Sequence, residues 1–223
     1  MATRRPGSKG DRTRQEIVRL AADLATALGL EGLTVGILAK SLAMSKSGLF
    51  AHFGSKEELQ LAIVDVARQH FEERVLPAGG EAEPGLPRLF ALLMAWTDHI
   101  EHTPHRGGCF FAAASAEFDD RAGPVRDEVA RLTRLWVDSL IREAAVAKSL
   151  GELHPEADSR QIAFEVHAFV QEANWAKQLH RDPRAFERAR RAIQACLTRE
   201  ATAKGRRSLS MSPYGGSRSH GSP

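Results

Sequence analysis

The segment from Thr34 to Lys56 constrains the fold most, because it predicts two short helices joined by a tight turn. The hydroxyl of Thr34 can cap the first helix by accepting a hydrogen bond from a free backbone N–H group. Ser45 can cap the second helix in the same way, so only residues 42–44 remain for the turn. Such a hinged pair is typical of a helix-turn-helix, which places the start of its second helix in a DNA major groove.

Two capping boxes predict further helix starts on either side of this segment. Ser55 and Glu58 have the spacing of a capping box. In this motif the hydroxyl accepts a hydrogen bond from the backbone N–H group of the later residue, and the carboxylate accepts one from the backbone N–H group of the earlier residue. Thr13 and Glu16 have the same spacing, and Gly29 can end the helix that follows them. These patterns therefore predict a three-helix domain in the N-terminal part of the chain, over residues 12–56.

Charge is divided unevenly along the chain. Residues 1–56 hold nine Lys and Arg against four Asp and Glu, a net charge of +5, whereas residues 57–203 hold eighteen against twenty-four, a net charge of −6. A basic N-terminal segment joined to an acidic remainder is consistent with a chain in which only the N-terminal segment binds DNA. We expect a disordered basic arm (1–11), a helix-turn-helix domain (12–56), a connector helix (55–76), a helical domain (77–203) and a disordered basic tail (204–223).

The residues from Thr34 through Phe50, with His52-Phe53 and the capping box that follows, resemble the DNA-binding signature of TetR-type (tetracycline-repressor-like) transcriptional regulators. Ala43 stands where the family usually has a turn glycine, and Phe50 where a tyrosine often donates its hydroxyl to a phosphate. The resemblance implies an all-α fold, in which an N-terminal three-helix helix-turn-helix domain precedes a helical ligand-sensing and dimerisation domain. It also implies a homodimer on a partly palindromic double-stranded DNA operator, which blocks transcription until a small-molecule effector releases it.

The family motif assigns the DNA contacts residue by residue. Lys56 is expected at a phosphate, because it lies at the N-terminus of a helix beside backbone amides that favour anions. Lys46 can bind a guanine edge or a phosphate, and the hydroxyl of Ser47 can replace the contact that Phe50 cannot make. The full set of predicted DNA-binding residues is Thr34, Ser45, Lys46, Ser47, Gly48, Phe50, His52 and Lys56.

The helix expected over 158–181 carries two apolar faces about 200° apart, so one face needs a partner outside its own core. A last helix is expected after Asp182-Pro183. In the family that the chain resembles, the last two helices of each subunit form a four-helix dimer interface; the alternative is a neighbouring helix of the same subunit. The predicted interface residues are Phe164, Ala168, Trp175, Leu179, Phe186 and Ile193.

Aromatic residues and a few polar groups in the body are candidates to line an effector cavity, again by resemblance. Ordinary core packing is the alternative for each of them. The candidates are Phe71, Trp96, His99, Phe110, Phe118, Trp136, His167 and Asn174.

Two other classes of protein remain as alternatives. His99, His102 and His105 recur every third residue, which suggests a metal site, although Pro104 interrupts the helix that would align them. A helical protein-interaction adaptor is the second alternative. No Gly-rich phosphate loop, nucleophile elbow or zinc-protease motif is present, so we expect neither an enzyme nor a cofactor. No stretch is apolar enough for a membrane span or a signal peptide, so we expect a cytoplasmic protein.

Overall fold

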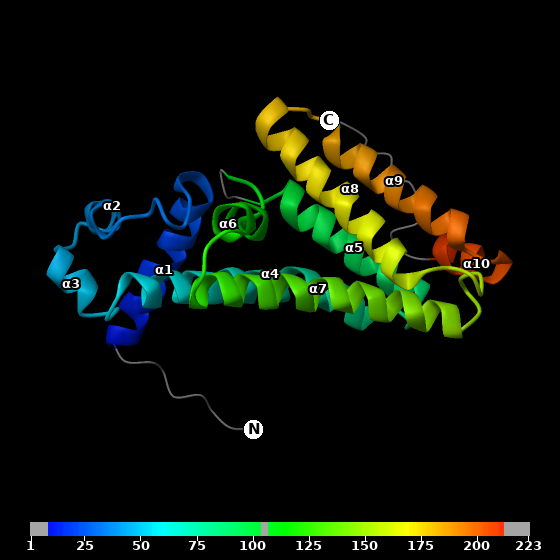
Figure 1. Cartoon of the computed structure of the whole chain (residues 1–223), viewed down its shortest axis with the longest axis horizontal. Coiled ribbons are helices and arrows are strands. Elements are labelled where there is room, and N and C mark those ends of the chain that lie inside the picture. Colours follow the sequence, from blue (N-terminus) through cyan, green and yellow to red (C-terminus); the bar gives the residue numbers. More distant parts are fainter. Residues whose placement is uncertain (1–8, 104–106, 212–223) are drawn as a thin grey trace, which may run out of the picture. The chain divides into compact units, whose positions relative to one another are not determined.

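The computed structural model describes residues 9–103 and 107–211, and all regular secondary structure in these residues is α-helical (Figure 1). The helices are α1 (Lys9–Leu28), α2 (Val35–Ser41), α3 (Lys46–Phe50), α4 (Lys56–Glu81), α5 (Leu86–Glu101), α6 (Phe110–Phe118), α7 (Pro124–Ser149), α8 (Ser159–His180), α9 (Ala185–Glu200) and α10 (Ala203–Met211).

Three of the four capping hydroxyls predicted from the sequence are confirmed. Thr34 Oγ1 and Ser45 Oγ each accept a hydrogen bond from the backbone N–H group three residues later, at 3.2 and 3.0 Å. Ser55 Oγ accepts from the N–H group of Glu58 at 3.0 Å. The Glu58 carboxylate accepts from the N–H group of Gly54 at 3.0 Å, one residue before the expected donor. Local side-chain chemistry thus sets three helix starts.

The start of α1 differs from the prediction. The helix begins at Lys9, so Thr13 lies inside it, and residues 9–11 are helical rather than part of a disordered arm. Arg14 lies with its guanidinium carbon 4.8 Å from the centre of the Phe53 ring, a cation–π contact that ties this end of α1 to the helix-turn-helix. Residues 1–8 of the predicted arm lie outside the described residues.

The predicted tail is also partly wrong, because α10 is an ordered helix. A Cβ atom added at Gly205 would lie 2.0 Å from the carbonyl oxygen of Glu152, so the helix can approach this closely only without a side chain there. Leu209 is 2% exposed, and Ser208 Oγ donates to Glu152 Oε1 at 2.9 Å. One glycine and one leucine therefore anchor a segment whose composition predicted disorder; residues 212–223 lie outside the described residues.

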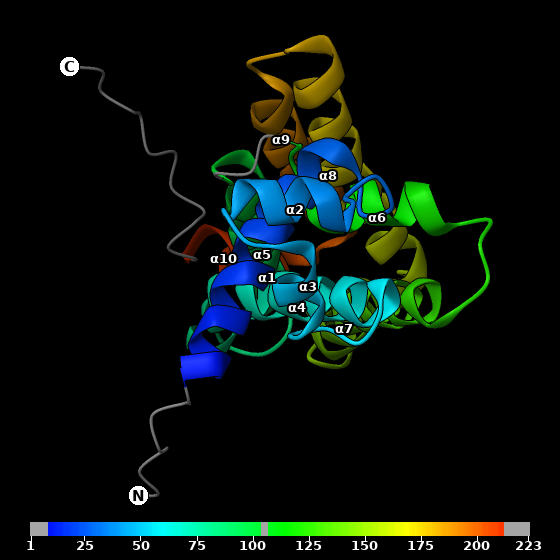
Figure 2. The same ribbon diagram turned by 90° about the vertical axis from the view of Figure 1, so that its left-hand side faces the viewer.

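The chain divides into two compact units, and the division differs from the predicted boundary at residue 77. Within the described residues, the first unit joins residues 9–70 with 107–132, so α6 packs with the helix-turn-helix rather than with the rest of the body. Its core brings Phe110, Ala114 and Phe118 of α6 together with apolar side chains of α1, α2, α3 and α4. Figure 2 shows α1, α2 and α3 facing the viewer.

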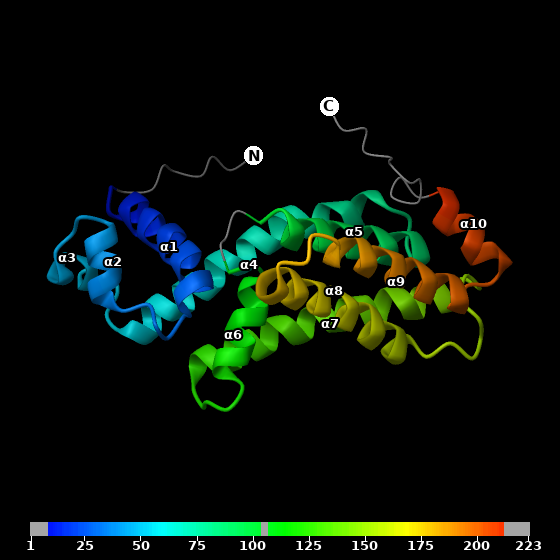
Figure 3. The same ribbon diagram turned by 90° about the horizontal axis from the view of Figure 1, so that it is seen from above.

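The second unit comprises residues 71–103 and, up to the last described residue, 133–211. Helix α5 is buried on most of its surface, and α8 and α9 form an adjacent antiparallel pair (Figure 3). Helix α4 continues through Pro77, which was expected to end it, into this unit. Among the described helices, none combines the length and the low charge that crossing a bilayer requires.

Candidate functional site

The turn between α2 and α3 adopts a conformation that suits glycine. Ala43 has a φ of +52°, in the left-handed region that costs an L-residue with a Cβ atom about 1–2 kcal/mol. The N–H group of Met44 nevertheless bonds to the carbonyl of Ala39 at 2.9 Å, which closes the turn. The departure from the family pattern at Ala43 therefore leaves the helix-turn-helix geometry in place.

The start of α3 is open to solvent. Ser45, Lys46 and Ser47 are exposed and Gly48 is half-buried, while Leu49 is 1% exposed in the core of the unit. Within the described residues, no ion pair or hydrogen bond engages the ammonium group of Lys46. The outer side of α3 thus offers a cation and two hydroxyl groups, which lie 3.2 Å apart.

Other predicted DNA-binding residues surround α3. Thr34 is exposed but its hydroxyl caps α2, and His52 is half-buried. The side chain of Phe50 lies outside the described parts of the structure.

Lys56 has a partner that the sequence analysis did not anticipate. Its Nζ atom donates to Glu31 Oε1 at 2.7 Å and to the carbonyl oxygen of Glu31 at 2.9 Å. A DNA phosphate would have to compete with this ion pair for the ammonium group. No local pattern signals the pair, because the two residues are 25 positions apart.

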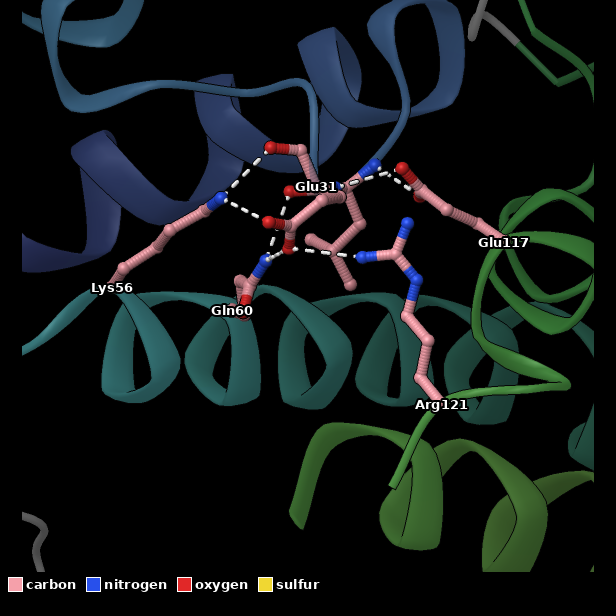
Figure 4. A network of polar contacts seen from close by, with 6 residues as sticks. Glu31, Lys56, Gln60, Glu117 and Arg121 are labelled. Carbon is pink, nitrogen blue, oxygen red and sulfur yellow. Dashed lines mark hydrogen bonds and ion pairs between the residues drawn. The ribbon is translucent and has the colours of Figure 1, made fainter. Parts of the chain in front are cut away.

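Glu31, in the loop after α1, is the centre of a polar network (Figure 4). Besides Lys56, its carboxylate accepts from Gln60 Nε2 at 2.9 Å and lies 3.7 Å from Arg121 Nη1. Gln60, which is 6% exposed, also donates to the carbonyl of Leu30 at 3.2 Å. The hydrogen bonds from Lys56 and Gln60 lower the pKa of the Glu31 carboxyl below its usual value. The network therefore binds this loop to the first turns of α4.

Glu117 of α6 binds the same loop from the other side. Its carboxylate accepts hydrogen bonds from the backbone N–H groups of Leu30 and Glu31, at 2.7 and 3.0 Å (Figure 4). Arg121, just after α6, adds the contact to the Glu31 side chain. Within the first unit, α6 is thus hydrogen-bonded to the loop that leads into the helix-turn-helix, and a shift of α6 would strain that loop.

Five of the predicted ligand-lining residues form one aromatic cluster in the second unit. The Trp136 ring contacts the rings of Phe71 and Trp96 edge-on, with centroids 5.0 and 5.3 Å apart. His167 stacks on Trp96 at 5.2 Å, and His99 meets Phe71 edge-on at 6.0 Å. Helices α4, α5, α7 and α8 each supply at least one of these rings.

The other three candidates lie elsewhere or have no ring contact. Phe110 and Phe118 pack in the core of the first unit, whereas the cluster belongs to the second. They are large apolar residues on the inner face of α6, and they form part of that core instead of the aromatic cluster. Asn174 is buried at 8% exposure on α8.

Helix α8 presents an apolar surface to solvent. Phe164, Trp175 and Leu179 are 68, 50 and 62% exposed, and Ala168 is exposed between them. We call these four residues the α8 patch.

Two predicted interface residues on α9 are buried inside the subunit instead. Phe186 and Ile193 are 2 and 0% exposed, because the apolar stripe of α9 packs against α8 and α5 of its own chain. The prediction that they meet a second subunit is wrong for this reason. Periodicity identified the stripe but not the surface that covers it.

The histidines considered as metal ligands are not gathered into a site. His102 is exposed and pairs with Asp98 at 3.0 Å, and His99 belongs to the aromatic cluster. His105 lies outside the described residues, within which no group of three His, Cys, Asp or Glu side chains is arranged to hold a metal ion.

Comparison with known proteins agrees with this architecture in both units. Residues 17–63 match the family described as "Bacterial regulatory proteins, tetR family", and residues 85–193 match the "Tetracyclin repressor-like, C-terminal domain". The two matches together cover more than half of the chain. The chain belongs to the TetR family. The all-α fold expected from the resemblance is thereby confirmed, and so is a transcription regulator rather than an enzyme.

Solved structures of TetR-family regulators share the fold along nearly their whole length. A TetR transcriptional regulator from Chloroflexus aurantiacus J-10-FL is 25% identical with a TM-score of 0.80, over 86% of this chain and 98% of that one. A TetR-family regulator from Cytophaga hutchinsonii is 20% identical with a TM-score of 0.77, over 90% of this chain and 100% of that one. AibR, solved with isovaleryl coenzyme A and operator DNA, is 22% identical with a TM-score of 0.66, over 81% of this chain and 95% of that one.

Proposed function

We propose that this TetR-family regulator is a cytoplasmic repressor that binds a partly palindromic operator as a homodimer and is released by a small molecule. The observation that carries the proposal is the exposed start of α3, where Lys46 has no partner among the described residues and stands between the hydroxyl-bearing residues Ser45 and Ser47. An exposed cation at the start of a recognition helix suits a guanine edge or a phosphate. AibR was solved with both an acyl-coenzyme A and operator DNA, so this fold can hold both kinds of partner.

The α8 patch supports the homodimer. Phe164, Trp175 and Leu179 place two aromatic rings and a leucine in water, and contiguous apolar surface of this kind marks a protein interface. A second copy of the same helix pair would cover the patch around a two-fold axis, as a partly palindromic operator requires. The partner face is therefore the outward face of α8, without Phe186 and Ile193.

Fluorescence anisotropy tests the DNA-binding part of the proposal. The probes are the DNA upstream of the protein's own gene and a scrambled fragment, compared over a salt series. We expect an advantage of about 10³ or more for the native fragment at physiological salt. Equal loss of binding to both fragments as salt rises would mean that only nonspecific charge attracts DNA.

Two lysine variants separate base reading from charge. Lys46→Ala should change the preference among operator variants, because it removes a side chain at the start of α3. Lys40→Ala removes the same charge from α2 and should weaken binding to every variant alike. If Lys46→Ala also weakens all variants equally, Lys46 binds a phosphate and reads no base.

Sedimentation of the purified chain tests the homodimer. Phe164→Ser should shift the wild-type dimer toward monomer, whereas Leu135→Ser, at a residue 48% exposed on α7, should leave it dimeric. A wild-type monomer at micromolar concentration would contradict the proposed interface. Transcription in vitro from the same upstream DNA then gives the sign of regulation, since a repressor lowers and an activator raises the transcript.

A further inference from the structure

The indole nitrogen of Trp136 is a buried donor without an acceptor. Trp136 is 9% exposed, and across the described residues its Nε1–H group is the sole buried side-chain nitrogen or oxygen that has no hydrogen-bond partner. Buried polar groups in native proteins are almost always paired with protein or ordered water, so this donor is open to an acceptor from outside the chain. The position of Trp136 at the centre of the aromatic cluster suggests where that partner binds.

The cluster offers apolar, flat surfaces around this donor. Phe71 and Trp96 meet the Trp136 ring edge-on at 5.0 and 5.3 Å, and His167 stacks on Trp96. Because these rings come from four helices, a molecule held among them would contact α4, α5, α7 and α8 at once. Aromatic surfaces of this kind favour a ligand with an apolar, preferably aromatic, body.

The surroundings disfavour a charged ligand. Burial lowers the pKa of His167, so its imidazole is neutral near pH 7. Among the described residues, the only buried ionic side chain is Glu152, and it is occupied by the N–H group of Leu86 and the hydroxyl of Ser208. A ligand ion would lose its hydration without gaining a buried counter-charge. A cation placed at the indole nitrogen would in addition face the positive end of the N–H dipole, which opposes the attraction of the ring faces.

We propose that the effector is an uncharged, largely apolar molecule whose oxygen or nitrogen acceptor binds the Nε1–H group of Trp136. The inference rests on the proposed function for the existence of an effector, and it adds the chemical class and the residue that selects it. Trp136 then distinguishes ligands by one hydrogen bond. The surrounding rings add apolar contact, which strengthens binding but does not depend on where the ligand carries its acceptor.

Two probes of similar shape test the acceptor requirement. Acetophenone carries a carbonyl oxygen where α-methylstyrene carries a methylene group, and benzyltrimethylammonium represents a cation of similar size. The full-length chain is labelled with ¹⁵N-tryptophan, which gives three indole N–H signals, from Trp96, Trp136 and Trp175. The Trp136→Phe variant assigns the signal of interest, and titration of each probe gives its dissociation constant.

We expect acetophenone to bind wild-type protein about tenfold more tightly than α-methylstyrene, as one hydrogen bond to a buried donor provides. Acetophenone should move the Trp136 indole proton downfield, and benzyltrimethylammonium should leave it unchanged. Trp136→Phe should bind both neutral probes equally. Leu76→Ala, at a residue 44% exposed on α4, should keep the tenfold preference.

Equal affinity of the two neutral probes for wild-type protein would overturn the inference, as would tighter binding of the cation or no response of the Trp136 signal to any probe. These comparisons use wild-type protein and decide the question even if Trp136→Phe fails to fold. No DNA is present, so failure here leaves operator binding untouched. Loss of the operator advantage, conversely, would leave the probe preference intact.

Discussion

Replacing Glu117 with alanine should destabilise the first unit through the loop after α1. The Glu117 carboxylate accepts two backbone hydrogen bonds, from Leu30 and Glu31, at 2.7 and 3.0 Å. A hydrogen bond to a charged group contributes about 1.5–3 kcal/mol, so the pair could contribute about 3–6 kcal/mol. Water can replace part of this because Glu117 is half-buried. We therefore expect the free energy of unfolding of this unit to fall by about 2–4 kcal/mol.

The position of the tryptophans allows the loss to be located. Trp96, Trp136 and Trp175 all belong to the second unit, whereas helical circular dichroism reports both units. In urea, Glu117→Ala should move the circular-dichroism transition to lower concentration more than the fluorescence transition. Hydrogen exchange at the amides of Leu30 and Glu31 should accelerate at least about 30-fold, the factor that corresponds to the lower limit of about 2 kcal/mol.

Asp120→Asn is the matched control, because it removes the same charge from an exposed residue close to Glu117. Its effect should stay within about 0.5 kcal/mol. The reasoning is refuted if Glu117→Ala is equally mild, or if the two amides exchange at the wild-type rate.

Three further predictions follow from single positions. Ala43→Gly should raise the melting temperature, because relief of the left-handed strain at φ +52° exceeds the added entropy of the unfolded chain by about 0.5–1 kcal/mol; Ala116→Gly, within α6, should lower it instead. Gly205→Ala should destabilise the second unit by about 1–3 kcal/mol, since the new Cβ atom would meet the Glu152 carbonyl at 2.0 Å, and limited proteolysis should then remove α10. Unchanged proteolysis would show that α10 accommodates the methyl group. Burial lowers the pKa of His167 from 6.5, so the unfolded chain takes up the proton first. The stabilisation from a neutral His167 is therefore complete above pH 6.5 and is lost as the pH falls through the folded-state pKa, and His167→Gln should flatten that part of a melting-temperature profile.

Local sequence patterns predicted the helix-turn-helix correctly. Thr34, Ser45 and Ser55 each act within a single helical turn, so their capping roles depend on neighbours that the sequence itself specifies. The turn at Ala43 was predictable for the same reason, although the residue there is not the glycine that the conformation favours. Dense local motifs thus determined the helix-turn-helix and, through it, the family.

Contacts between distant segments were not accessible from the sequence. The pairing of Lys56 with Glu31 links α4 to the loop after α1, and Glu117 reaches the same loop across 86 positions. Nothing in the spacing of these residues indicates that they meet. The tertiary structure alone brought Lys56, the expected phosphate ligand, into an ion pair.

The two faces of α8 and the stripe of α9 show the same division. Hydrophobic periodicity determined which side of each helix is apolar, because side-chain direction repeats with the helical turn. It did not determine what covers each side: Phe186 is buried within the subunit, whereas Phe164 remains exposed. Hydrophobic burial is non-directional, so the sequence of an apolar stripe does not specify which surface will pack against it. Only the packing of the complete chain decided which stripes were used within the subunit and which one was left for another surface.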